Sequence, residues 1–207
     1  MSTLAASVGP ARERAGSRLA YQATVAIAAS LFVALSAQIS LKLPITPVPF
    51  TGQTLAVLVV GAALGPELGA VSLLLYLAEG AAGLHFFAGG GHGVAVLTSL
   101  SSAHFTGGYL WGFVAASAVV GWLSRRGWDR SIRSAIGAML IGEIVIYAFG
   151  VPWLMGSLDL PAAKGLEYGL YPFVVSDTLK LLVAAGLLPG AWRLVGRGGT
   201  GEPGEAG

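Results

Sequence analysis

The chain has 207 residues, of which 55% are hydrophobic and only 11% are charged, and its mean hydropathy is +0.74. This charged share is about half or less of that in a soluble domain, so the composition indicates a membrane protein. The absence of cysteine excludes disulfides, thiolate metal sites and cysteine nucleophiles. The net charge of +2 indicates little by itself, because the positions of charges matter more here than their sum.

The two ends of the chain differ in composition from the part between them. The first 20 residues are polar and contain three arginines. A signal peptide would follow its basic region with a short apolar stretch and a cleavage site, whereas a full-length apolar span follows here. We therefore predict an uncleaved cytoplasmic N-terminal tail at 1–20, a transmembrane substrate-binding domain at 21–195, and a disordered cytoplasmic tail at 196–207.

Six apolar segments are candidates for crossing a bilayer. They lie at about 21–41, 53–64, 66–84, 107–124, 133–155 and 171–192. The second is short for a span and Gly65-Pro66 separates it from the third, so this pair is either tilted or bent at that point. No internal repeat is visible, and an inverted-repeat transporter therefore has no direct support. The predicted fold class is all-α, a polytopic membrane protein with six transmembrane helices.

The basic residues predict the orientation in the membrane. With six spans and a cytoplasmic N-terminus, nine of the twelve fall inside the cell. These nine are Arg12, Arg14, Arg18, Arg125, Arg126, Arg130, Arg133, Arg193 and Arg197. Only Lys42 and Lys164 fall outside, and Lys180 lies within a span. The positive-inside rule therefore predicts that both termini are cytoplasmic.

The last apolar segment contains an acid and a base, Asp177 and Lys180, three residues apart. This spacing places both side chains on one face of a helix. An ionisable side chain at mid-membrane costs about 2.5–3.5 kcal/mol on insertion scales, so the pair indicates a site for an ion, a proton or a substrate. The alternative is a structural ion pair that holds helices together.

Two predicted external segments have an unusual composition. Residues 43–53 contain three prolines, which hold the backbone extended and exclude a helix. Thr51, Gln53 and Thr54 then bring hydrogen-bonding groups to the mouth of the second span. Residues 85–93 contain His92 and a run of glycines, whose backbone can approach a ligand closely. The alternative for either segment is a turn forced by a tight connection.

Other side chains suggest other chemistries. Ser102 and His104 resemble the nucleophile and base of an intramembrane serine hydrolase, but no oxyanion-forming turn is evident beside them. The spacings of the three histidines fit no single helical face, which argues against a metal site. The glycine-rich loop lacks the lysine of a phosphate-binding loop. We therefore expect no enzyme activity, no catalytic residues, no metal and no cofactor.

Five groups of motifs follow one another along the chain. They are Ala34-Leu-Ser-Ala-Gln38-Ile-Ser, Pro47-Val-Pro-Phe-Thr51-Gly-Gln53-Thr, Gly80-Ala-Ala-Gly-Leu84 with Phe87-Ala-Gly-Gly90, Thr106-Gly-Gly-Tyr109, and Ser176-Asp177-Thr-Leu-Lys180. In the order of these motifs, the chain resembles the BioY family. The resemblance covers roughly residues 28–190, and the string that begins at Pro47 is its most specific part. BioY proteins are the biotin-binding S components of energy-coupling factor (ECF) transporters.

The resemblance implies a multi-pass subunit of the cytoplasmic cell membrane that captures biotin near the outer face. In the family, such a subunit works with an ECF transmembrane coupling subunit and two ATPase subunits, so ATP would be used by the partners only. No nucleic-acid partner is expected. Ser30 and Ala34 fit the small-xxx-small face that meets the coupling subunit in S components, and ordinary packing within the chain is the alternative. An S component for another vitamin or precursor is the alternative function.

The chemistry of biotin agrees with the acid-base pair. Its ureido ring offers two N–H donors and one carbonyl acceptor, and its valeryl chain ends in a carboxylate. Asp177 can accept a ureido N–H in a charge-assisted hydrogen bond, and Lys180 can meet a ligand oxygen. The expected substrate site, with its aromatic members placed by position alone, comprises Asp177, Lys180, Gly89, Gly90, His92, Phe50, Thr51, Gln53, Phe87, Tyr147 and Trp153.

The chain departs from the family pattern where the ligand carboxylate is expected. Family members sometimes carry an arginine in the stretch that reads Gly89-Gly90-Gly91-His92 here. If that arginine normally holds the carboxylate, then His92 or a nest of backbone N–H groups must replace it in this chain.

Overall fold

The computed structural model describes residues 3–8 and 15–198. Arg12, Arg14 and residues 199–207, which carry part of the predicted tails and of the predicted charge bias, lie outside the described residues. The side chains of Arg193 and Arg197 lie outside them as well.

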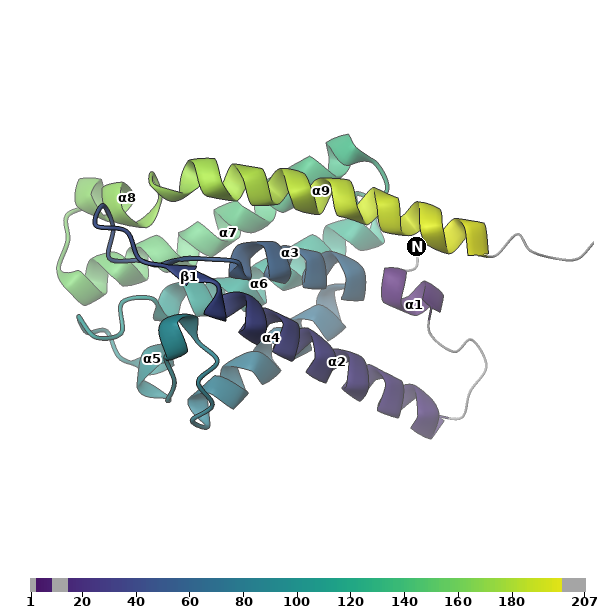
Figure 1. Ribbon diagram of the computed structural model, residues 1–207, viewed down its shortest axis with the longest axis horizontal. Coiled ribbons are helices and arrows are strands. Elements are labelled where there is room, and N and C mark those ends of the chain that lie inside the picture. The colour runs from purple at the N-terminus through teal and green to yellow at the C-terminus, as the bar shows by residue number, and fades with distance from the viewer. Residues whose placement is uncertain (1–2, 9–14, 199–207) are drawn as a thin grey trace, which may run out of the picture.

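The described part of the chain is mostly helical (Figure 1). Its helices are α1 (Leu4–Val8), α2 (Ala15–Gln38), α3 (Gln53–Leu64), α4 (Pro66–Ala81), the 3₁₀ turn η1 (Ala88–Gly90), α5 (Ala95–Thr98), α6 (Gly107–Arg125), α7 (Ile132–Leu158), α8 (Ala162–Gly169) and α9 (Phe173–Gly198). As predicted, the proline-rich segment is not helical. It connects β1 (Ser40–Leu41) to β2 (Phe50–Thr51), which pair antiparallel with Ser40 opposite Thr51.

Four helices are long and apolar enough to cross a membrane. They are Gly16–Gln38, Gly107–Arg125, Ile132–Leu158 and Phe173–Trp192. The other two predicted spans correspond to α3 and α4, which have 12 and 16 residues and are shorter than the roughly 20 residues that a perpendicular span needs. The chain is therefore a mostly helical membrane protein with four candidate spans and a pair of shorter helices.

The helices α3 and α4 form a hairpin at Gly65. Gly65 has φ +85°, a conformation that favours glycine, and Pro66 then begins α4, where its missing N–H leaves no donor unpaired. The two helices pack closely, because a Cβ on Gly69 would lie 3.2 Å from the Cα of Gly61. The hairpin also packs against α6, since a Cβ on Gly61 would lie 2.6 Å from the carbonyl oxygen of Ser117.

Helix α6 packs most extensively against α7, and glycines make their close approach possible. A Cβ on Gly112 of α6 would lie 2.9 Å from the carbonyl oxygen of Ile146 on α7. In the other direction, the ring of Tyr109 on α6 packs directly against Gly150 of α7, where a Cβ would collide with it. Small residues at the contact between helices are typical of membrane proteins, where close backbone approach gains van der Waals contact.

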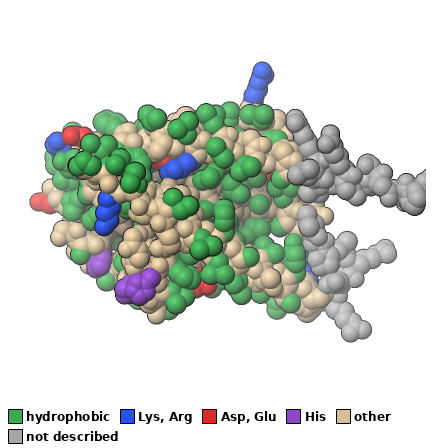
Figure 2. Space-filling model, in the orientation of Figure 1, with side chains coloured by type: hydrophobic (Ala, Val, Ile, Leu, Met, Phe, Trp, Pro, Cys, Tyr) green, Lys and Arg blue, Asp and Glu red, His purple; other side chains and the backbone are tan. Residues whose placement is uncertain are grey.

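Many large hydrophobic side chains are exposed on the outer surface. Figure 2 shows hydrophobic side chains spread across one face of the molecule, with few charged side chains among them. Large exposed side chains include Leu35 on α2, Ile144 on α7, and Val175 and Leu179 on α9. Many large apolar side chains exposed on helices of membrane-spanning length are suited to contact with lipid.

Candidate functional site

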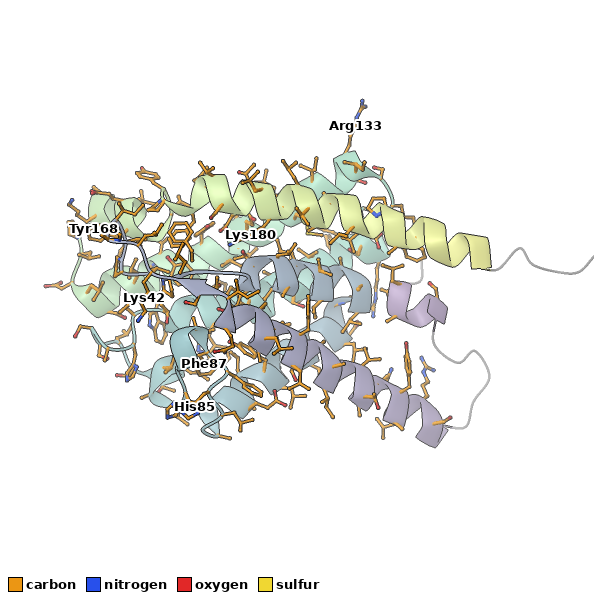
Figure 3. All side chains as sticks on the ribbon, viewed as in Figure 1. Lys42, His85, Phe87, Arg133, Tyr168 and Lys180 are labelled. Atoms are coloured by element: carbon orange, nitrogen blue, oxygen red, sulfur yellow. The ribbon has the colours of Figure 1, made fainter. Side chains whose placement is uncertain are left out.

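A cavity of about 560 Å³ lies between the helices at the end of the molecule that carries β1, α5 and α8 (Figure 1). Helices α3, α6, α7 and α9 contribute side chains to it, and so do the proline-rich segment and the glycine-rich loop. Among the residues that Figure 3 labels, Lys42, Phe87 and Lys180 line the cavity. Lys42 lies nearer this end of the molecule than Lys180 does, and Phe87 lies in the glycine-rich loop. We call the part around Lys180 the floor and the part around Lys42 the rim.

The floor contains the acid-base pair that the sequence predicts. Both residues lie on α9, with Lys180 Nζ 2.7 Å from Asp177 Oδ1. The side chain of Thr54 on α3 joins them, because Lys180 donates to Thr54 Oγ1 (3.2 Å), which in turn donates to Asp177 Oδ1 (3.4 Å). On the other side, the Tyr147 hydroxyl of α7 donates to Asp177 Oδ2. One buried carboxylate thus connects three helices.

The floor retains hydrogen-bonding capacity for a ligand. Asp177 is 2% exposed, and a carboxylate has about four lone-pair positions, whereas Oδ2 accepts only from Tyr147 among the described residues. The ammonium of Lys180 has three protons and uses two of them, for Asp177 and Thr54. The site therefore offers one anionic acceptor and one cationic donor side by side.

Aromatic side chains form much of the wall above the floor. Phe87, Tyr109, Phe113 and Phe173 line the cavity together with Tyr147. The rings of Tyr109 and Tyr147 meet edge to face, with centroids 6.3 Å apart, and the Tyr109 hydroxyl donates to the Gly169 carbonyl (2.8 Å). Such a wall is suited to the apolar part of a small ligand.

A hydrogen-bond chain fixes the glycine-rich loop to the helices. Gln53 Nε2 donates to the Tyr76 hydroxyl (2.8 Å), which donates to the carbonyl of Phe86 (3.2 Å). The ring of Phe87 is 2% exposed and fills the space beside Gly80, where a Cβ would collide with it. Because the loop is anchored at Phe86 and Phe87, the glycines that follow are held over the cavity.

Nine of the eleven side chains or glycines predicted for the site line the cavity. These are Asp177, Lys180, Gly89, Gly90, His92, Thr51, Gln53, Phe87 and Tyr147. The structure places Phe50 and Trp153 behind the wall instead. Phe50 stacks on Phe173 with ring centroids 4.3 Å apart, and Trp153 donates from Nε1 to the carbonyl of His104 (3.0 Å). Both therefore support lining residues without lining the cavity themselves.

The predicted partner face on the first span is occupied within the chain. Ser30 is fully buried and Ala34 is 4% exposed, and α2 packs against α4 and α3. The opposite side of α2, with Leu31 and Leu35, is exposed. In this structure Ser30 and Ala34 therefore pack within the chain, which was the alternative considered for them.

The described residues form neither the serine hydrolase site nor the histidine metal site that the sequence analysis considered. Ser102 is exposed, and no hydrogen bond joins it to His104 in the part of the chain that the structure describes. The rings of His85 and His92 lie close together at a tilted angle, with centroids 4.0 Å apart, but no group of three potential metal ligands is present in residues 3–8 and 15–198.

Sequence reasoning missed several residues that line the cavity. Lys42 entered only as an external charge, and Phe173 and Tyr109 received no role in the site. Thr54, by contrast, was expected to bring a hydrogen-bonding group to the mouth of the second span, and the structure places it on the floor beside Asp177 and Lys180.

Together, the apolar helices and the enclosed polar floor define a membrane protein with a small-molecule site between its helices. The chain belongs to the BioY family, whose family model matches residues 10–197.

Curated relatives match most of this chain. A protein of Rhizobium etli named "Biotin transporter BioY" is 34% identical over 77% of this chain and 86% of its own length. A protein of Pyrococcus horikoshii named "Probable biotin transporter BioY" is 38% identical over 75% of this chain and 88% of its own length.

A solved structure shares the fold. It is described as the "S-component for biotin from an ECF-type ABC transporter", and it matches with a TM-score of 0.75 over 88% of this chain and 95% of its own. The two sequences are 21% identical, so this match supports the arrangement of the helices.

Proposed function

We propose that this chain is the biotin-capturing S component of an ECF transporter, a binding subunit and not an enzyme. The observation that carries the proposal is the Asp177–Lys180 pair on the floor of an aromatic-walled cavity, in a chain of the BioY family. Relatives that match three quarters of this chain are named biotin transporters. A cavity of about 560 Å³ is in the range usual for small-molecule sites.

The functional groups of biotin match the free capacity of the site. A ureido N–H would donate to Asp177 Oδ2, and the ureido carbonyl would accept the remaining proton of Lys180. The thiophane ring and the valeryl chain would lie against the aromatic wall, at Phe87 and Phe173. The carboxylate would then lie toward the rim.

The arrangement of charges supports a six-crossing topology with both termini in the cytoplasm. Arg125, Arg126, Arg130 and Arg133 lie in or beside the connection of α6 to α7, and α6 separates this connection from the cavity-lining loops. The tails at 1–20 and 196–207 would be cytoplasmic and residues 21–195 would form the transmembrane domain. The cavity would then open to the outside of the cell membrane, where the vitamin is captured.

Transport would require further subunits. We assign ATP hydrolysis to two ATPase subunits, which would act through a transmembrane coupling subunit, with no cofactor bound by this chain. The relatives' names and the S-component fold support this division of labour.

Calorimetric titration of the purified protein with biotin tests the proposal. We expect saturable binding that Asp177→Asn weakens at least about tenfold, because the amide cannot provide the charge-assisted hydrogen bond. Thiamine should not bind. Asp159→Asn is the matched control, since Asp159 is exposed and its left-handed backbone (φ 51°) suits asparagine. Unchanged affinity in Asp177→Asn would remove Asp177 from the site, and a folded sample that binds no biotin would contradict the proposed substrate.

A further inference from the structure

Lys42 lies at the rim of the cavity and has no partner there. It follows β1, and its side chain reaches the glycine-rich loop, since a Cβ on Gly89 would lie 4.0 Å from Lys42 Cε. Lys42 is exposed, and the structure shows no hydrogen bond or ion pair for it among the described residues. Lys180 on the floor, by contrast, is paired with Asp177.

The ionisable groups that line the cavity do not balance. Within the described part of the chain they comprise two lysines, Lys42 and Lys180, and one acid, Asp177, together with two histidines. Since Asp177 and Lys180 neutralise each other, one positive charge remains, and it lies at the rim. An unbalanced charge at the mouth of a low-dielectric cavity attracts a ligand of opposite sign. The cavity is therefore suited to a ligand with a neutral polar head and an anionic tail.

Part of what the sequence offered for the tail carboxylate is engaged within the loop. His92 Nδ1 lies 3.3 Å from the carbonyl of Gly90, and in the tautomer with the proton on Nδ1 it donates there, which leaves Nε2 as an acceptor. The backbone N–H groups of Gly90 and Gly91 donate to the carbonyls of Phe87 (3.0 Å) and Ala88 (3.3 Å). These two amides are therefore not free to donate to a carboxylate, whereas the ammonium of Lys42 is.

We infer that Lys42 binds the ligand carboxylate at the rim and so makes the site selective for an anionic vitamin over its neutral derivatives. This inference rests on the proposed function, because it takes the polar head to lie at Asp177 and Lys180. From its position between β1 and the proline-rich segment, the flexible lysine stem extends to the carboxylate, while the glycine-rich loop lies opposite without side chains that would obstruct it. Lys42 is thus a specificity-determining residue supplied by the first external segment.

Titrating two ligands against two lysine variants tests this role. Biotin and its primary amide differ only at the tail, where a neutral carboxamide of nearly the same shape replaces the carboxylate. Lys42→Met should weaken biotin binding by about five- to tenfold, between the effect of an exposed ion pair and that of a charge-assisted hydrogen bond, and should leave the affinity for the amide unchanged. Lys42→Arg should retain the preference for biotin. Lys164→Met is the matched control, because Lys164 is an exposed lysine that pairs with Glu167 (2.8 Å) and does not line the cavity.

The possible results distinguish recognition of the carboxylate by Lys42 from a packing role of this side chain. Added salt should weaken biotin binding to the unmodified protein more than amide binding, and this difference should vanish in Lys42→Met. A Lys42→Met protein that still prefers biotin to the same extent would overturn the inference, and so would an equal loss for both ligands, which would show a packing role. If the unmodified protein binds neither ligand, the proposed function fails, and the inference fails with it.

Discussion

At the scale of single residues, the acid-base pair is both a costly feature for a membrane-spanning helix and the basis of the proposed site. Asp177 is surrounded by donors from three helices, and the carboxylate is hydrogen-bonded before any ligand binds. Pre-formed contacts of this kind reduce the reorganisation that binding requires, because the ligand meets groups that already point toward it. Because the two charges compensate each other, the fold tolerates them only while both are present.

Replacing Lys180 alone should therefore lower the stability of the protein more than replacing Lys180 and Asp177 together. In Lys180→Met the Asp177 carboxylate stays buried without its counter-ion, and we expect a loss of about 3 kcal/mol, near the low end for a broken buried pair because Lys180 remains 21% exposed. In the double variant Asp177→Leu/Lys180→Met no charge is stranded, so thermal stability should recover while biotin binding stays lost. Thermal unfolding in detergent measures the first effect and calorimetry the second. A double variant less stable than Lys180→Met would contradict this explanation.

At the scale of elements, the shape of the cavity depends on how closely α6 approaches α7. Tyr109 and Tyr147 face each other across this contact and both line the cavity. Neither helix can move away from the other without shifting one of the two rings. Glycines within the helices thus determine the geometry of the wall.

Gly112→Ala tests this dependence. Its Cβ would lie 2.9 Å from the carbonyl oxygen of Ile146, and the backbone must shift to accept it, so we expect a loss of about 1–3 kcal/mol and weaker biotin binding. Gly186→Ala on α9 is the matched control, because no atom lies within 4 Å of its Cβ and alanine favours a helix by up to about 1 kcal/mol. Melting temperatures and biotin titrations of both variants provide the comparison. Equal effects of the two substitutions would show that the close approach of α6 and α7 is not what stabilises the wall.

A buried aspartate connects other elements at the end opposite the cavity. Asp129, in the connection of α6 to α7, is fully buried and accepts a hydrogen bond from Trp192 Nε1 of α9 (2.6 Å), and the guanidinium of Arg130 lies 4.6 Å from the centre of the Trp192 ring. Burial raises the pKa of the Asp129 carboxyl above its ordinary value of 3.8, although Trp192 and Arg130 act in the opposite direction. The folded protein therefore holds the Asp129 proton more readily than the unfolded chain does.

The sign of the resulting pH dependence follows from proton linkage. Between the ordinary pKa and the raised one, the folded state binds more protons than the unfolded state, so stability falls as the pH rises through that window. Asp129→Asn removes the titration and keeps an oxygen that accepts from Trp192. Its melting temperature relative to the unmodified protein should therefore rise as the pH is raised from about 4 to about 7. A difference that stays constant with pH would exclude Asp129 as the cause, and Asp159→Asn controls for the loss of an exposed carboxylate.

At the scale of the whole molecule, the positions of the long helices follow from the sequence because apolar runs are a local property. The placement of Asp177 and Lys180 on one face follows in the same way, from their spacing along a single helix. The buried face of α2 was not predictable from periodicity, since apolar side chains cover the helix all round, with Val33 buried and Leu35 exposed only two residues apart. Periodicity could not show that this face packs against α4, and Ser30 and Ala34 were therefore assigned to a partner.

Contacts between segments that lie far apart in the chain could not be predicted from the sequence pattern either. Lys42 meets the loop at Gly89 across 47 positions of the chain, and neither residue carries a pattern that points to the other. Phe50 and Trp153 were expected in the site by position alone, and the structure places each behind a residue that does line it. Tertiary packing, and not local propensity, determines which aromatic side chain faces the cavity.

The orientation of the whole chain can be tested with single cysteines, because the chain contains none of its own. Ser102 lies in the loop before α6 at the cavity end, whereas Arg133 lies at the start of α7 and points away from the body of the molecule (Figure 3). If both termini are cytoplasmic, a membrane-impermeant maleimide should label Ser102→Cys in intact cells and Arg133→Cys only after lysis. Ala103→Cys, which lines the cavity, should be labelled from outside as well, and biotin should protect it. Ala138→Cys is fully buried and should react only after denaturation. The reverse pattern would invert the topology and place the mouth of the cavity on the cytoplasmic side, where it could not capture an external vitamin.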